Sequence, residues 1–407
     1  MKGSLADIRI IVADDQADVA RTLCRPLHAA GARLLYVEDG RAAFREISRR
    51  PFDLALVDMK MPPGEWGGLW LLEELRAAGL GIPAISLSGE GAKQQVIQAI
   101  RLGAVDWINK DAASEELLDR CVQVLEERLA KALDVGGAVL PLPLALRLAR
   151  YARTTDPDKR FMAGLHALEA VFRFAAILGL ASSPPRPLSA VKMSSLAAPS
   201  MGTWFQLCLA LEAIPDSHKD LARLISWLVP DRTDRSTVQE LINVRNQVAH
   251  GRGSSSSAQR ERLGALLRRF AHRASSLLRA ELVVPTSMTF DGLWYNVDLV
   301  VLKGAGRPIP SRSQTHRPMV TGDVIYLPKG GDEVALGPWM VSAKDSNSED
   351  LRFFHFDGLL GGRGRDLSEA TFRYAPADDG DAPSEGPHAP PSATGEVLAS
   401  WANAKYP

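Results

Sequence analysis

The stretch IRIIVADD, residues 8–15, decides the fold of the first part of the chain, because a short apolar, β-branched run ends there in two adjacent carboxylates. A run of this kind predicts a buried β-strand. Similar runs follow at RLLYV (33–37), DLALV (53–57), PAISL (83–87) and VDWIN (105–109). The segments between them have helical periodicity, as in 68–79 and 114–133. Strands that alternate with helices predict a parallel sheet covered on both faces, so we expect an α/β doubly wound (βα)5 domain over residues 1–133.

Polar side chains stand where these strands end. The acidic pair Asp14 and Asp15 ends the first strand, Asp58 the third, Ser88 the fourth and Lys110 the fifth. Parallel strands bring their carboxyl ends to one edge of the sheet, which is where ligands bind in such folds. Three converging carboxylates repel one another unless a cation lies among them, and an oxygen-lined pocket suits Mg²⁺. A lysine and a hydroxyl beside them can bind the oxygens of a phosphoryl group carried by one carboxylate.

These residues resemble the receiver domain of bacterial response regulators. The match consists of the acidic pair, Asp58 followed by MKMP, Ser88 and Lys110. The resemblance implies that Mg²⁺ is held by Asp14, Asp15, Asp58 and the backbone carbonyl of Lys60. The alternative, that the acids are only solvated loop residues, would require five matching residue types at matching strand ends by coincidence.

The resemblance also implies a reaction and a partner. Asp58 would accept a phosphoryl group from a phosphohistidine on a histidine kinase or phosphotransfer protein, and Ser88 and Lys110 would then engage that group. Trp107 stands at the switch position, where tyrosine or phenylalanine is commoner. Two departures from the family pattern are Asp111, where proline usually follows the lysine, and a slightly longer loop after the acceptor, PPGEWGG (62–68).

The second part of the chain changes to helical periodicity throughout. Two glycines and two prolines within LDVGGAVLPLPL (133–144) predict a linker at 134–144. From there to residue 284 the pattern is that of amphipathic and buried helices, as in FMAGLHALEAVFRFAAILGL (161–180). We therefore expect an all-α domain over residues 145–284.

One stretch of this domain, LINVRNQVAHGRG (241–253), carries a polar cluster. Asn246 and His250 are four residues apart on one helix face, with Arg245 beside them. An arginine can stabilise phosphate oxygens and a histidine can act as base or acid, so the three could cleave RNA without a metal. The stretch resembles the R-N-x-x-x-H signature of HEPN domains, accompanied by SMGTWFQL (200–207). The resemblance implies a HEPN-like domain that forms a homodimer and is a possible ribonuclease.

Other interpretations of this part stay open. His250 precedes Gly251, a predicted helix C-cap, and a histidine there can stabilise the helix end without catalysis. The HEPN-like domain would then be a dimerisation or interaction module, and the protein a phosphate sink or protein-binding regulator. Seven arginines within 252–279 could guide an RNA backbone, or could pair with acids elsewhere in the fold.

The remaining sequence is less informative. Short strands with glycine turns predict a small antiparallel β module over 285–375, and the polar, proline-rich residues 376–407 predict a disordered tail. Lys plus Arg and Asp plus Glu both total 48, so a net charge of zero disfavours bulk attraction to nucleic acid or membrane. Three scattered cysteines and the lack of an apolar leader in MKGSLADIRI predict a soluble, cytoplasmic protein that is not bound to a membrane.

Overall fold

The chain folds into two compact units. The computed structural model describes residues 5–89, 93–186, 188, 191, 193–214, 217–249, 255–329, 331–344, 351–360, 370–377, 397 and 401. Unit 1 contains residues 1–135 and 268–278, and unit 2 contains residues 136–267 and 279–407.

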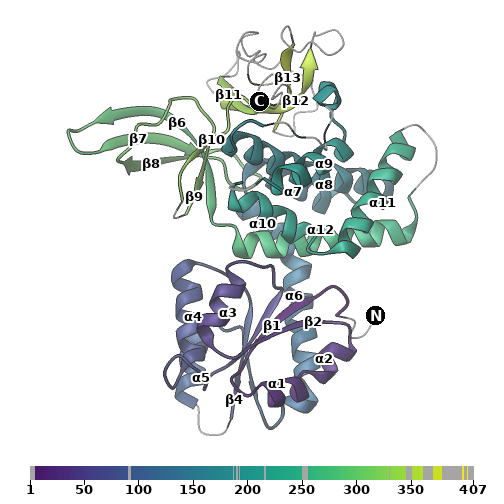
Figure 1. Ribbon diagram of the computed structural model, residues 1–407, viewed down its shortest axis with the longest axis vertical. Coiled ribbons are helices and arrows are strands. Elements are labelled where there is room, and N and C mark those ends of the chain that lie inside the picture. Colours follow the sequence, from purple (N-terminus) through teal and green to yellow (C-terminus); the bar gives the residue numbers. More distant parts are fainter. Residues whose placement is uncertain are drawn as a thin grey trace. The chain divides into compact units, whose positions relative to one another are not determined.

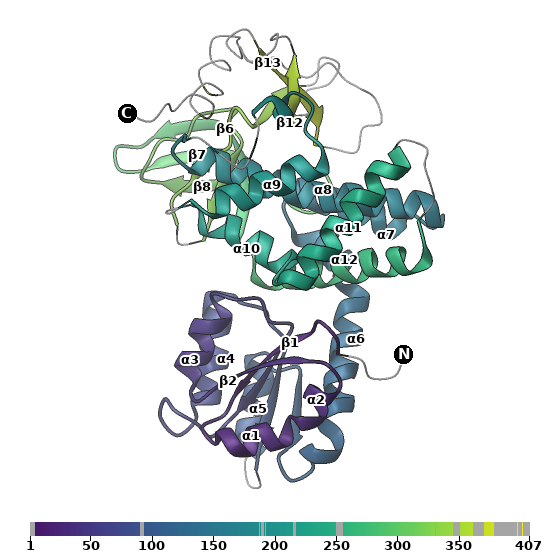
Figure 2. The same ribbon diagram turned by 45° about the vertical axis from the view of Figure 1, so that its right-hand side comes forward.

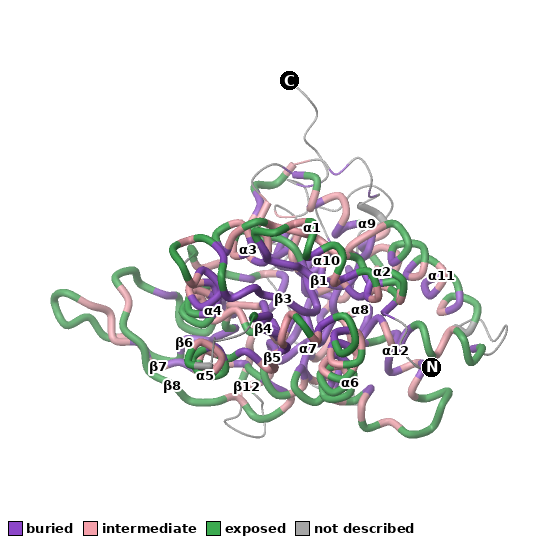
Figure 3. Tube along the Cα trace, turned by 90° about the horizontal axis from the view of Figure 1, so that it is seen from below, coloured by how far each residue is buried: buried purple, intermediate pink, exposed green. Residues whose placement is uncertain are grey.

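Unit 1 is built on a five-stranded parallel sheet in the order β2-β1-β3-β4-β5. Its strands are β1 (Arg9–Ala13), β2 (Arg33–Val37), β3 (Leu54–Asp58), β4 (Ala84–Ser88) and β5 (Asp106–Asn109). The central strands β1, β3 and β4 are almost completely buried (Figure 3). The doubly wound α/β fold predicted for this part of the chain is therefore confirmed.

Helices cover both faces of this sheet (Figures 1 and 2). They are α1 (Ala17–Leu23), α2 (Arg25–Ala29), α3 (Gly40–Ile47), α4 (Gly67–Ala78), α5 (Lys93–Leu102) and α6 (Ala113–Val139). On one face, strand residues such as Ile10 and Leu56 form a core with Leu27 of α2 and Leu117 of α6. On the other face, α4 packs between α3 and α5. The apolar runs that predicted strands thus form the centre of the unit.

The linker predicted at 134–144 is wrong. Helix α6 continues to Val139, and α7 (Leu142–Arg153) begins three residues later. A Cβ at Gly137 would lie 3.3 Å from the Cβ of Ala149, so this glycine allows α6 and α7 to approach closely. Pro143 lies in the first turn of α7, where the missing N–H has no helical acceptor to lose. The glycines and prolines therefore mark a tight helix packing and a helix start.

Residues 268–278, which the sequence assigns to the helical domain, belong to unit 1. They form the end of α12 (Ser257–Leu277). The Arg273 guanidinium pairs with the Asp53 carboxylate through two contacts of 2.8 Å, and both side chains are at most 1% exposed. The backbone N–H of Gly81 donates to the carbonyl of Ser276 at 2.8 Å. Arginines of the basic stretch thus pair with acids of the fold, as one of the two interpretations expected.

Unit 2 begins with helices, and α8 is its core. The helices are α7, α8 (Pro157–Ser182), a 3-10 turn (Met193–Ala197), α9 (Met201–Glu212), α10 (Lys219–Leu228), α11 (Arg232–Ala249) and the first part of α12. Helix α8 contacts α7, α9, α10 and α11. Among the described residues it is the helix with the length and hydropathy of a membrane span, yet 78% of its apolar window is buried inside the structure. That burial is typical of a core helix.

Two antiparallel sheets follow the helices of unit 2. The first has the order β10-β9-β6-β7-β8 and the second β11-β12-β13. Their strands are β6 (Ala280–Phe290), β7 (Tyr295–Val301), β8 (Ile309–Thr315), β9 (Ile325–Pro328), β10 (Val334–Ala335), β11 (Met340–Lys344), β12 (Leu351–Leu360) and β13 (Thr371–Pro376). The predicted antiparallel module is confirmed, but it starts at residue 280 rather than 285 and has two sheets.

The predicted disordered tail (376–407) is wrong at the residues that are described. Pro376 ends β13, and Ala377 is buried. Trp401 is helical and only 1% exposed. The other residues of this range, 378–396, 398–400 and 402–407, lie outside the described part of the chain.

Candidate functional site

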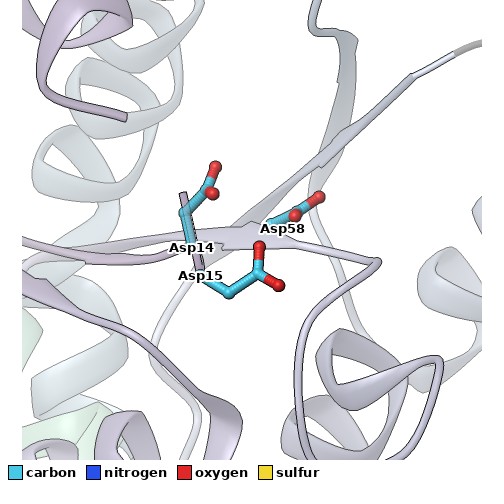
Figure 4. A group of neighbouring side chains, drawn as sticks. All are labelled: Asp14, Asp15 and Asp58. Carbon is cyan, nitrogen blue, oxygen red and sulfur yellow. The ribbon is translucent and has the colours of Figure 1, made fainter. Parts of the chain in front are cut away.

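Three carboxylates meet at the carboxyl ends of β1 and β3. One oxygen each of Asp14, Asp15 and Asp58 can be chosen so that all three lie within 4.8 Å of one another (Figure 4). Asp14 and Asp58 are buried, at 2% and 3% exposure, whereas Asp15 is exposed. Because β1 and β3 are adjacent parallel strands, their ends bring these residues together. The convergence expected from the sequence is thus present.

The ammonium of Lys110 joins two of these acids. Its Nζ lies 2.9 Å from Oδ2 of Asp14 and 3.0 Å from Oδ2 of Asp58. Lys110 follows β5, and its backbone N–H donates to the carbonyl of Ser88 at the end of β4. The lysine side chain is 18% exposed, so a group that arrives from solvent can reach it.

Among the described residues, the charges at this site are not balanced. Burial raises the pKa of Asp58, and the neighbouring Asp14 raises it further, against the lowering effect of Lys110. Burial tends to lower the pKa of Lys110, but the two carboxylates outweigh it and the pKa is raised. Among the described residues one ammonium thus stands against three carboxylates and contacts two of them, so negative charge is in excess.

The remaining residues expected at the site lie near it with different contacts. The backbone N–H of Lys60 is 3.4 Å from Oδ1 of Asp58. The hydroxyl of Ser88, itself 3% exposed, donates to the carbonyl of Gly89 at 3.1 Å. Trp107 lies on β5 and pairs in register with Ser86 of β4. Its indole N–H is buried without a hydrogen-bond partner among the described residues, which leaves it a polar group that a rearrangement could satisfy.

Sequence reasoning missed the role of two glycines at the start of α4. A Cβ at Gly68 would lie 2.3 Å from the backbone oxygen of Asp58 and 2.8 Å from the Cα of Met59. A Cβ at Gly67 would lie 2.3 Å from the backbone oxygens of Met61 and Pro62. These distances exclude any side chain, so the pair allows α4 to close against the backbone after the acceptor. The signal was present in the sequence as the GG that ends PPGEWGG.

The donor set fits Mg²⁺. The ion prefers carboxylate and carbonyl oxygens, and it usually binds to one or two carboxylates while keeping several waters. Asp14 and Asp58 supply buried oxygens, and exposed Asp15 leaves a side open to solvent. The excess negative charge supplies the electrostatic reason for a divalent cation at this point.

The second group of predicted residues is described only in part. Arg245 and Asn246 lie on α11, and Asn246 is exposed. The guanidinium of Arg245 is 28% exposed, with Nη2 3.7 Å from Oε2 of Glu169 on α8. His250 lies outside the described residues.

Comparison with known proteins gives a match to one domain. Residues 10–122 match the family model described as the response regulator receiver domain. The transcriptional regulatory protein RprY of Bacteroides fragilis is 31% identical over 118 residues, which cover 29% of this chain and 49% of the relative. The swarming motility regulation protein RssB of Serratia marcescens is 33% identical over 123 residues, covering 30% and 55%. This chain thus spans about half the length of these curated relatives.

Two solved receiver domains each align with less than a third of this chain. The receiver domain of the Francisella response regulator 1452 is 27% identical, covers 30% of this chain and 98% of its own, and has a TM-score of 0.28. The receiver domain of NtrX from Brucella abortus is 28% identical, with 29% and 98% covered and a TM-score of 0.27. The family match ends at residue 122, so it does not test the HEPN resemblance of the helical part. Together with the acidic site, the family match shows that residues 10–122 form a response regulator receiver domain.

Proposed function

We propose that Asp58 is the phosphoacceptor of this receiver domain and that its donor is a phosphohistidine on a histidine kinase or phosphotransfer protein. A carboxylate oxygen of Asp58 attacks the phosphorus, the P–N bond to the imidazole breaks, and the imidazole keeps the electron pair. The product on this chain is an acyl phosphate. The observation that carries the proposal is the shared Lys110 ammonium, 3.0 Å from Asp58 and 2.9 Å from Asp14.

The chain's own residues have distinct tasks in this reaction. Asp14, Asp15, Asp58 and the Lys60 carbonyl would hold Mg²⁺, which neutralises charge on the attacked phosphoryl group. Lys110 would bind a phosphoryl oxygen, since its ammonium already contacts the carboxylate of Asp58 that would carry the phosphoryl group. Ser88 would exchange its bond to the Gly89 carbonyl for a phosphoryl oxygen. Trp107 would change its environment in response, as a switch residue.

The helical part of unit 2 would be the output under receiver control. The sequence motif supports a metal-independent ribonuclease in which Arg245 stabilises the phosphorane, His250 acts as base or acid, and Asn246 orients them. The contact between Arg245 and Glu169 supports the alternative, a non-enzymatic phosphate sink or protein-binding regulator whose helical part is a dimerisation or interaction module. A cytoplasmic location agrees with both.

Phosphorylation tests the first proposal. The full chain is incubated with Mg²⁺ and phosphoramidate, whose P–N bond resembles that of phosphohistidine, and the covalent adduct is followed by intact mass and peptide mapping. We expect one phosphoryl group on Asp58, none on Asp58→Asn, and normal labelling of Asp18→Asn, a control at an exposed acid. Labelling of Asp58→Asn at the wild-type level, or a wild-type adduct elsewhere, would overturn the assignment.

Two further measurements separate the outputs. Cleavage of mixed RNA by the wild type but not by His250→Ala, with a rate that changes on phosphorylation, would support the ribonuclease. An adduct on Asp58 with no cleavage under either condition would support the non-enzymatic alternative. Light scattering on the two phosphorylation states tests the homodimer directly.

A further inference from the structure

Unit 2 contains a cavity that the receiver chemistry does not use. Its volume is about 240 Å³. Helices α7, α8 and α11 and strands β11 and β12 contribute its walls, and α7 and α11 both lie alongside α8 (Figure 2). The charged and titratable groups that line it are Arg147, Arg173, Arg245, His166, His355 and Glu169. The described lining thus contains three arginines and one acid.

Several contacts hold the side chain of Arg173 in the wall of the cavity. Its Nη2 lies 2.9 Å from Oε1 of Glu169 and 3.4 Å from Oδ1 of Asp357, and its Nη1 contacts Nε2 of His355. Its guanidinium carbon lies 5.4 Å from the ring centre of Trp204, a cation–π arrangement. The Nε of Arg173 is nevertheless buried with no hydrogen-bond partner among the described residues. A buried cation is thus fixed in place with a donor left to satisfy.

The acids near the cavity are shared among several arginines. Glu169 contacts Arg173 at 2.9 Å and Arg245 at 3.7 Å. Asp357, the next acid, contacts both Arg173 at 3.4 Å and Arg373 at 3.3 Å. Each carboxylate therefore serves two guanidinium groups, so that among these described residues three guanidinium groups, of Arg173, Arg245 and Arg373, stand against two carboxylates.

The histidines respond to this excess. Burial lowers the pKa of His355 well below its usual value, and Arg173 and Arg147 lower it further. Burial also lowers the pKa of His166, against the opposite effect of Glu169. Both rings thus lie in an environment that disfavours more positive charge. An anion in the cavity would remove that penalty.

The other walls are apolar. Phe174 and Ile177 of α8 and Met340 of β11 also line the cavity. A space of this size suits a small molecule. A ligand that fits would combine a compact dianion with a small apolar body.

We propose that this cavity binds a small phosphate monoester, with Arg147, Arg173 and Arg245 around the phosphate and Phe174, Ile177 and Met340 against the organic part. Guanidinium groups match phosphate oxygens in pairs, and a dianion offsets the local excess of charge better than a carboxylate does. The site requires neither phosphorylation of Asp58 nor RNA cleavage.

Titration calorimetry on the full chain tests the proposal, with phenyl phosphate as the probe and EDTA present to suppress any magnesium-dependent binding at the receiver. We expect one site, and a loss of affinity of about tenfold or more in Arg147→Gln and in Arg245→Gln, because each removes a charged hydrogen-bond donor. Arg153→Gln is the matched control, since Arg153 is an exposed residue of the same helix as Arg147 and does not line the cavity. Its affinity should stay within about twofold of wild type.

A second probe tests the chemical class of the ligand, and a second variant tests whether phenyl phosphate binds away from the receiver site. Benzoate, with a single negative charge, should bind more weakly than phenyl phosphate, and Asp58→Asn should bind phenyl phosphate like wild type. If benzoate binds as tightly, or if neither arginine variant weakens binding, or if phenyl phosphate does not bind, the proposal is wrong. Should Arg245→Gln fail to fold, as judged by circular dichroism, Arg147→Gln carries the test alone.

Discussion

The ion pair of Asp53 and Arg273 provides a sharp stability test for unit 1. Asp53→Asn removes one charge and leaves a guanidinium at 1% exposure facing a neutral amide. Breaking a buried ion pair from one side costs about 3–5 kcal/mol, because the other charge stays buried without compensation. The carboxylate also accepts the backbone N–H of Arg9 at 2.8 Å, a second bond that the variant weakens. With a urea slope of about 2 kcal/mol per molar, 3 kcal/mol lowers the midpoint by about 1.5 M.

The assay must report on unit 1 alone. We would follow hydrogen exchange of peptides that span β1 and β3 across a urea series in the full chain. Asp18→Asn is the control within the same unit, since the Asp18 side chain is 99% exposed beside Arg21; its midpoint should not move measurably. The double variant Asp53→Leu/Arg273→Leu completes a cycle and should recover much of the loss. A midpoint for Asp53→Asn equal to that of Asp18→Asn would refute the reasoning.

Three other outcomes are expected. The pKa of Asp53 is lowered in the folded state, since Arg273 outweighs burial. The stability that the ion pair contributes is therefore fully present above the unfolded pKa, about 3.9, and is lost as the pH falls from there through the lower folded pKa. Acid unfolding of Asp53→Asn should consequently depend less on pH than that of wild type. Gly68→Ala places a Cβ 2.3 Å from the Asp58 carbonyl oxygen. This variant should destabilise unit 1 by about 1–3 kcal/mol and slow its labelling by phosphoramidate. The control Gly306→Ala, whose Cβ has nothing within 4 Å, should change neither the stability nor the labelling rate. If unit 2 is a ribonuclease, His250→Ala should abolish RNA cleavage and leave labelling of Asp58 unchanged; cleavage at the wild-type rate would exclude that role for His250.

Local sequence patterns were sufficient to predict the fold of the receiver domain and the acidic residues at the edge of its sheet. Each strand of unit 1 begins and ends within one residue of its predicted run, because a short apolar run bounded by polar residues has few alternatives inside a parallel sheet. The convergence of Asp14, Asp15 and Asp58 followed from topology alone, since parallel neighbours end at the same edge.

Features that depend on distant residues were not predictable in this way. By sequence, Gly137 resembles a linker residue. In the fold it lies in α6 against α7, where an added Cβ would be 3.3 Å from the Cβ of Ala149. Arg273 belongs to a basic helix by sequence, and only the fold shows its partner Asp53, 220 residues earlier. The arginine-rich cavity likewise combines residues from α7, α8, α11 and two strands, and only Arg245 among its arginines belongs to a motif that the sequence analysis singled out.

Strand β3 shows why burial alone does not identify a reactive carboxylate. Asp53 immediately precedes the strand and Asp58 ends it, and both are buried aspartates with a basic partner. Their pKa values nevertheless move in opposite directions: the pKa of Asp53 is lowered and that of Asp58 is raised. Asp53 accepts two contacts of 2.8 Å from the guanidinium of Arg273. Asp58, in contrast, shares the ammonium of Lys110 with Asp14. The first carboxylate is satisfied within the chain and suits a structural role. The second requires a further positive charge, and that requirement favours Asp58 as the residue that binds Mg²⁺ and takes the phosphoryl group.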